Sequence, residues 1–111
     1  MKFLLIIAHD DQFQGDPALV RSIQTWVTAH TEKGIRLVGA PLKPPSEART
    51  INPDGSKDVS HAPFSPGPLH TAAFELIECP DMEAATTIAQ SHPMATRATI
   101  EVRPVWEELL G

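Results

Sequence analysis

A histidine and a carboxylate stand next to each other near the start of the chain, at His9 and Asp10. A neighbouring carboxylate can fix the tautomer of an imidazole and raise its pKa, which suits the histidine to act as a general base. The pair directly follows an apolar run over residues 3–8. We therefore expect both side chains at a strand end that faces an enclosed space; the alternative is a solvated strand end without chemistry.

A second histidine, His61, precedes a stretch rich in proline over residues 63–68. Proline fixes φ and removes an N–H donor, so this stretch predicts a stiff loop that presents its side chains with little entropy left to lose. We expect His61 to be a second proton-transfer residue and Phe64 an apolar lid, both close to His9 and Asp10. A hydrogen-bonded structural corner is the alternative.

Charged residues alternate with apolar ones on two predicted strands: Glu75 lies between Phe74 and Leu76, and Glu101 and Arg103 lie beside Ile100 and Val102. Successive strand residues point to opposite faces of a sheet. If the apolar set packs against helices, Glu75, Glu101 and Arg103 line the opposite face. Arg103 could then hold a carboxylate or an enolate, whereas a salt bridge between subunits is the alternative.

The sequence contains no motif for a metal or an organic cofactor. His9, His61 and Asp10 are acceptable metal ligands, but they lack the close spacing of a metal site. Cys79 is the single cysteine, which excludes an internal disulfide and predicts a small apolar filler. His30 and His92 fall at predicted helix C-termini, where an imidazolium complements the dipole without any further role. We expect a protein that works without a cofactor.

Two helices are predicted to position these residues. Asp16 and Pro17 are typical of an N-cap and a first helical position, and Gly34 is typical of the residue that follows a helix. Between them, Leu19, Val20, Ile23, Trp26, Val27 and His30 recur at helical spacing. The second helix begins after Asp81 as N-cap and ends before Pro93, with a stripe of Met82, Ala85, Ile88 and Ala89.

Strands are predicted over residues 3–8, 35–42, 74–78 and 98–103, with a hairpin of residues 49–52 and 57–60 around the turn at 53–56. The order β-α-β-(hairpin)-β-α-β indicates a ferredoxin-like α+β fold in one domain over residues 1–111. The first strand is apolar without alternation, so we expect both of its faces to be buried. Two helices cover only one face of a sheet, which predicts a homodimer that meets sheet to sheet.

The segment Val59-Ser60-His61-Ala62-Pro63-Phe64 resembles the Val-Thr-Asp-Gly-Pro-Phe signature of the YCII-related (DGPF) domain proteins, with His61 in place of the aspartate and Ala62 in place of the glycine. The order of the other segments agrees, including Gly39-Ala40-Pro41-Leu42, and Asp10 falls where many members carry an acid. The resemblance implies a dimeric α/β barrel. That group includes isomerases, lyases and dehalogenases of small cyclic compounds.

Composition narrows the range of functions. The chain has 111 residues and a net charge of −5, which argues against a nucleic-acid partner. The apolar run over residues 3–8 is too short for a membrane span or a signal core, so we expect a cytoplasmic protein that does not bind membranes.

Two functions fit these observations. The first is a cofactor-free enzyme that transfers a proton next to a carbonyl of a small molecule, with His9 or His61 as base and Arg103 as anion clamp. The second is a non-catalytic ligand-binding or regulatory module of the same fold. A polar cavity with a perturbed histidine favours the enzyme, and a cavity filled by Phe64 and Trp106 favours the module.

Overall fold

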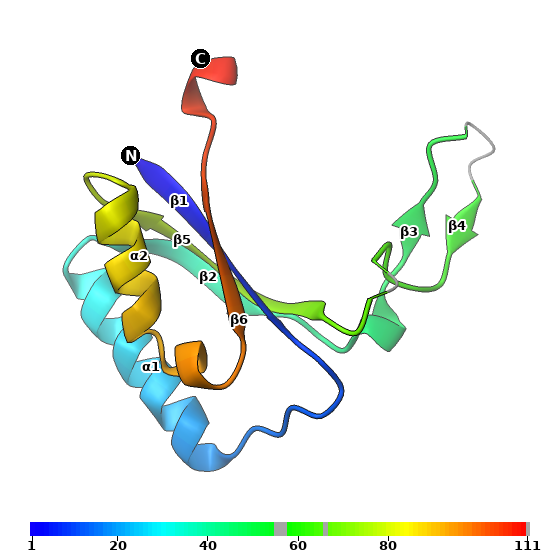
Figure 1. Ribbon diagram of the computed structural model, residues 1–111, viewed down its shortest axis with the longest axis horizontal. Helices are drawn as coiled ribbons and strands as arrows, with labels where there is room; N and C mark the ends of the chain where they lie inside the picture. The colour runs from blue at the N-terminus through cyan, green and yellow to red at the C-terminus, as the bar shows by residue number, and fades with distance from the viewer. Residues whose placement is uncertain (55–57, 66, 111) are drawn as a thin grey trace.

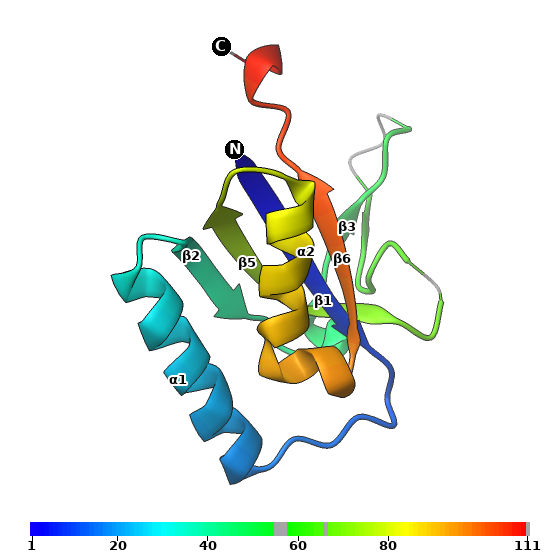
Figure 2. The same cartoon turned by 60° about the vertical axis from the view of Figure 1, so that its left-hand side comes forward.

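The computed structural model describes residues 1–54, 58–65 and 67–110. Its main sheet contains β1 (Lys2–His9), β2 (Arg36–Pro41), β5 (His70–Glu78) and β6 (Thr99–Pro104), in the order β2-β5-β1-β6. All three ladders between these strands are antiparallel. Helices α1 (Pro17–Glu32) and α2 (Met82–Ser91) lie on the same side of the sheet (Figures 1 and 2). This arrangement confirms the predicted ferredoxin-like α+β fold.

Helix α1 begins and ends where its cap residues predict. The carboxylate of Asp16 accepts a hydrogen bond from the Leu19 N–H at 2.8 Å, and Pro17 follows in the first turn. Gly34 has a φ of 71°, the left-handed conformation that glycine adopts at low cost after a helix. Leu19 and Trp26 of the predicted stripe are buried, as expected. Val20 is half exposed, so its place in the stripe was predicted wrongly.

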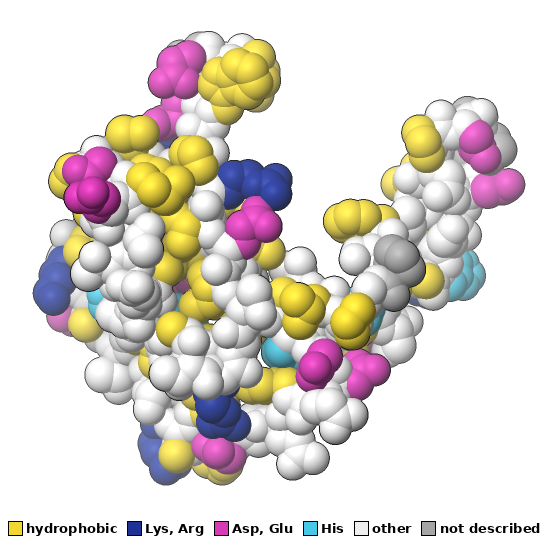
Figure 3. Space-filling view, viewed as in Figure 1, with side chains coloured by type: hydrophobic (Ala, Val, Ile, Leu, Met, Phe, Trp, Pro, Cys, Tyr) yellow, Lys and Arg dark blue, Asp and Glu magenta, His cyan; other side chains and the backbone are white. Residues whose placement is uncertain are grey.

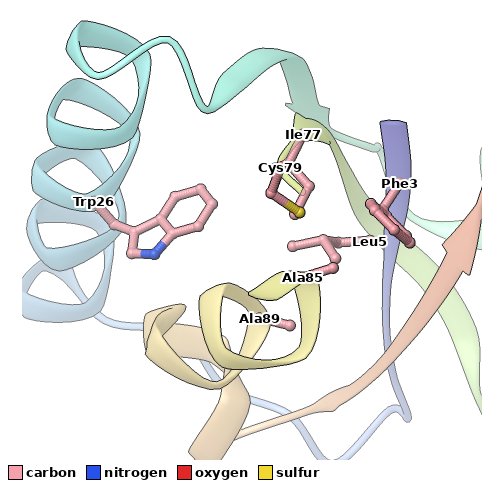
Figure 4. Packing of buried hydrophobic residues seen from close by; sticks show 7 residues of the cluster. All are labelled: Phe3, Leu5, Trp26, Ile77, Cys79, Ala85 and Ala89. Carbon is pink, nitrogen blue, oxygen red and sulfur yellow. The ribbon is translucent and has the colours of Figure 1, made fainter. Parts of the chain in front are cut away.

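The core lies between the two helices and one face of the sheet (Figure 4). Phe3, Leu5 and Ile7 of β1 are fully buried on this face, and Trp26 and the small side chains of α2 pack in the same layer. The alternate residues of β1 on the other face, Leu4 among them, are only half buried. In the described part of one chain no helix covers this second face. The expectation that a second copy buries it stays a prediction.

Strand β5 begins at His70, four residues before the predicted start, because it continues the ladder with β1 to the pair of His9 and His70. The hairpin of β3 (Thr50–Ile51) and β4 (Val59–Ser60) forms as predicted. Lys57 and part of the predicted turn lie outside the described residues. The hairpin projects as an arm from the body of the molecule, with a hollow between arm and body (Figure 3).

The remaining described elements are three short 3₁₀ helices, η1 (Pro45–Glu47), η2 (Pro93–Thr96) and η3 (Glu107–Leu109). Helix η2 follows α2 directly and turns the chain toward β6. None of the helices in the part of the chain that the structure describes is long and apolar enough to cross a membrane.

Candidate functional site

Glu75 points toward the helices, which corrects the predicted orientation. It pairs with Leu5 in the antiparallel ladder, so both side chains lie on the same face of the sheet. Leu5 is fully buried under the helices, and Glu75 is only 4% exposed. Its neighbours Phe74 and Leu76 therefore occupy the uncovered face. The prediction was wrong because it assumed that the larger apolar residues of β5 face the core, whereas the pairing with β1 places the charge there.

An arginine from the neighbouring strand compensates the buried charge of Glu75. Arg36 Nε donates to Glu75 Oε2 at 2.5 Å, and Arg36 Nη2 donates to the Gly39 carbonyl at 2.9 Å. Burying a lone carboxylate is costly, and an ion pair with additional hydrogen bonds offsets much of that cost. Arg36 was not predicted to take part in a site.

Gly39 leaves the space that this ion pair needs. It lies opposite Glu75 on the ladder between β2 and β5. A Cβ atom at this position would stand 2.6 Å from the carbonyl oxygen of Phe74 and would overlap the Glu75 carboxylate. Because one of these atoms belongs to the backbone, a side-chain movement cannot relieve the clash. The glycine therefore allows the carboxylate to lie over the edge of the sheet and reach Arg36.

His92 faces the same carboxylate from the other side. It caps α2 at its C-terminus, as expected, but it is also 2% exposed and packs against Trp26, with ring centroids 4.5 Å apart. Its Nδ1 accepts the Met94 N–H at 3.0 Å, so in the neutral ring Nε2 carries the proton. Nε2 has no hydrogen-bond partner and lies 3.9 Å from Glu75 Oε1. The prediction that His92 needs no further role does not account for this donor.

Arg36, Glu75 and His92 line a cavity of about 610 Å³ between α1 and the sheet, here called the helix–sheet cavity. Most of its other walls are apolar side chains, among them Ile7, Leu19, Ile23, Val27, Ala73 and Met94. A mostly apolar cavity with a few convergent polar groups is the usual form of a small-molecule site. This cavity is the best candidate for the functional site.

His9 also lines the helix–sheet cavity, beside Phe13, on which its ring stacks at 4.2 Å. Its Nδ1 donates to the backbone carbonyl of Asp10 at 3.0 Å. The Asp10 carboxylate instead accepts the Gln12 N–H at 2.9 Å. The tautomer of His9 is thus fixed by a backbone carbonyl and not by the predicted carboxylate. Its Nε2 remains as the lone-pair nitrogen.

The described residues also form cavities outside the helix–sheet cavity, two of which contain predicted site residues. The first, of about 630 Å³, lies at the end of β1 and is lined by His9, Asp10 and Arg97 among others. The second, of about 590 Å³, lies on the uncovered face and is lined by Phe64 and Glu101 among others. Among the described residues His61 is exposed and lines none of the three cavities, so the structure places it in no cavity with His9.

Phe64 is 87% exposed, and it lines the cavity on the uncovered face rather than the helix–sheet cavity. Glu101 and Arg103 lie on the uncovered face of the sheet, as predicted, because they pair with Ile6 and Leu4 of β1. They form an ion pair with each other at 2.6 Å, and more than half of each side chain is exposed. The roles predicted for His61, Phe64, Glu101 and Arg103 stay predictions.

The described residues contain no cluster of three His, Cys, Asp or Glu side chains that could hold a metal ion. Cys79 is buried in the core as a small filler, and burial raises the pKa of its thiol. Its Sγ lies 3.6 Å from the Asp81 carbonyl. The charged and hydrogen-bonding groups most suited to chemistry are therefore those of the helix–sheet cavity.

Comparisons with known proteins place the chain in a family. A comparison with curated proteins gives no match. Among solved structures, the chain is similar to 5-chloro-2-hydroxyhydroquinone dehydrochlorinase from Burkholderia phenoliruptrix AC1100, solved in complex with 2,5-dihydroxybenzoquinone. The sequence identity is 19% and the TM-score 0.48, over 95% of this chain and 93% of the other. The model of the YCII-related domain matches residues 1–108. The chain therefore belongs to the YCII-related domain family.

Proposed function

We propose that this protein is a cofactor-free enzyme that transfers a proton next to a carbonyl group of a small organic molecule in the helix–sheet cavity. One observation carries the proposal. The Glu75 carboxylate and the His92 Nε2–H face each other across 3.9 Å in a mostly apolar cavity, without a hydrogen bond between them. A base and a hydrogen-bond donor that lie this close together can act from the same side on two neighbouring atoms of one substrate.

Each member of the site has a distinct role in this reaction. Arg36 holds Glu75 through Oε2, which leaves Oε1 toward His92 as the proton acceptor. His92 donates from Nε2 to the oxygen on which negative charge develops. This assignment moves the base from His9 or His61 to Glu75. His9, with a free Nε2 in the same cavity, is a second proton carrier for the return step.

The anion clamp predicted at Arg103 has no place in this site, because Arg103 lies on the uncovered face, paired with Glu101. A non-catalytic ligand-binding module is the second candidate function. It was expected if Phe64 and Trp106 filled the cavity, but both are strongly exposed and neither lines the helix–sheet cavity. The enzyme was expected from a polar cavity, whereas the helix–sheet cavity is mostly apolar. Our preference for the enzyme therefore rests on the juxtaposition of Glu75 and His92.

The homodimer is part of this proposal, together with a cytoplasmic location. The uncovered face carries the half-buried alternate residues of β1, and the strongly exposed Phe64 lines the cavity on this face together with Ile6. A second copy that meets this face would bury those side chains. Hydrodynamic mass at micromolar concentration tests the dimer, and a stable monomer would contradict it.

The reaction is tested with phenylacetone, a benzyl ketone whose benzylic protons exchange with deuterium when the enolate forms. Proton NMR in D₂O measures this exchange with the wild-type protein, with Glu75→Gln and with the control Glu101→Gln. We expect wild type and Glu101→Gln to accelerate exchange, and Glu75→Gln to lose at least about 100-fold of the acceleration. Equal rates for the two variants would overturn the role of Glu75. Binding of phenylacetone without exchange by the wild type would favour the binding module.

A further inference from the structure

The helix–sheet cavity contains one polar group that the protein leaves unsatisfied. His92 Nε2 is buried and has no hydrogen-bond partner, and Glu75 Oε1 at 3.9 Å is beyond hydrogen-bond distance. A buried donor without an acceptor loses its hydrogen bond to water without replacement, which destabilises the protein. A ligand oxygen that accepts from Nε2 would remove this cost, so the donor marks the position of a ligand acceptor atom.

The tautomer of His92 is fixed by the backbone, which makes Nε2 a donor. The Met94 N–H can only donate, so Nδ1 must present its lone pair, and a doubly protonated ring would lose this hydrogen bond. Packing against Trp26 holds the orientation of the ring. The site therefore offers the imidazole N–H at Nε2, a group that suits the oxygen of a carbonyl and stabilises the enolate formed from it.

The fixed charges of the cavity cancel each other. Among the described residues that line it, Arg36 and Glu75 are the two with a fixed charge, and they are bonded to each other. The Nη2 of Arg36 is also occupied, by the Gly39 carbonyl. A ligand carboxylate would share with Glu75 the single positive charge of Arg36 and would lie beside a negative charge in a mostly apolar space. Such an arrangement disfavours an anionic ligand.

We infer that the substrate of this site is an uncharged, largely apolar carbonyl compound, bound through its carbonyl oxygen to the Nε2–H of His92. This inference rests on the proposed function and names its substrate class. In the reaction, Glu75 Oε1 takes a proton from the carbon next to the carbonyl. The electrons of the C–H bond form a C=C bond, and the negative charge moves to the oxygen that His92 contacts. Return of the proton to carbon completes the exchange without an oxidant or a reductant.

Two matched probes test the inference. Phenylacetone and phenylpyruvate share a benzyl ketone. Phenylacetone carries a methyl group on the carbonyl carbon, where phenylpyruvate carries a carboxylate. Binding of each to the wild-type protein is measured by calorimetry, and benzylic exchange by NMR. We expect phenylacetone to bind at least about tenfold more tightly than phenylpyruvate, which corresponds to about 1.4 kcal/mol for one unfavourable charge contact. We also expect the protein to accelerate benzylic exchange, relative to the rate in buffer, more for phenylacetone than for phenylpyruvate.

Variants of His92 test the contact to the oxygen. His92→Gln keeps an N–H donor near the position of Nε2, and we expect it to retain most of the phenylacetone affinity, whereas His92→Leu loses it. The comparison of the two probes on the wild type does not depend on whether these variants fold.

The outcomes separate the two proposals. Equal or tighter binding of phenylpyruvate, with exchange, would overturn the uncharged substrate and leave proton transfer in the cavity standing. Full phenylacetone affinity in His92→Leu would overturn the contact to His92. Failure of the wild type to bind or exchange either probe would overturn the proposed function and this inference together.

Discussion

The two faces of the sheet each carry an arginine–glutamate pair, and the two pairs differ in their surroundings. On the helix side, Arg36 and Glu75 have 16% and 6% of their side chains exposed. On the uncovered side, Arg103 and Glu101 have 67% and 52% exposed. An exposed pair of this kind contributes little to stability, because water screens the charges and two long side chains lose entropy.

The buried pair depends on several other groups, and the exposed pair does not. Gly39 provides the space and an acceptor, and His92 faces the carboxylate. A buried charge persists only where such groups compensate it, and buried, precisely held charges beside a cavity are typical of functional sites. The comparison indicates that surroundings, more than residue type, decide which acid performs chemistry.

Substitution of Gly39 should have the largest effect on stability. In Gly39→Ala the new Cβ clashes with the Phe74 carbonyl and displaces Glu75, so we expect a loss of about 3 kcal/mol in the free energy of unfolding. Urea denaturation measures the loss. Gly15→Ala is the control, because its Cβ would make only an ordinary contact of 3.6 Å with the Phe13 ring. Equal stability of the two variants would contradict the close packing of Glu75.

The comparison of the two arginines is the next test. Arg36→Met leaves the Glu75 carboxylate buried without its cation, and we expect a loss of about 2 kcal/mol, less than for a fully buried pair because Arg36 is partly exposed. Arg103→Met should change the free energy of unfolding by less than about 0.5 kcal/mol. Urea denaturation measures both losses, at a protein concentration below the dissociation constant of the proposed dimer, so that a second copy does not cover Arg103. Similar losses would show that the two faces do not differ.

The smallest effect concerns Cys79. Burial raises the pKa of its thiol, so the folded state favours the neutral form. The resulting contribution to stability is present below the pKa of the unfolded thiol and is lost as the pH rises through the folded value. We expect Cys79→Ala to show a weaker fall in stability at alkaline pH than the wild type, as measured by urea denaturation. A steeper fall in the variant would contradict the direction of the shift.

Local sequence signals predicted the elements well and the site only in part. Asp16, Gly34 and Asp81 mark helix ends through short-range cap geometry, which the sequence displays directly. The alternation around Glu101 and Arg103 correctly placed both on the uncovered face.

The face of Glu75 depends instead on the register between β1 and β5, which alternation within one strand does not determine when large apolar residues flank the charge. The environment of His92 arises from contact with Trp26 on the other helix, far away in the sequence. The sequence does contain a signal for Arg36. It is a charged residue near a glycine, Gly39, on an edge strand, where the glycine lies opposite a glutamate. This signal can be recognised only when the pairing of the strands is known.

The five histidines of the chain allow one direct test of the central claim, that the helix–sheet cavity is the site of chemistry. NMR of the imidazole ¹⁵N and ¹³C nuclei, with single His→Gln variants for assignment, follows each ring during a titration with phenylacetone. We expect His92 to be in the Nε2–H form. The probe should shift the resonances of His92 and His9, which line this cavity, while those of His61 do not move. Shifts confined to His61 or His70, with His92 unchanged, would contradict it.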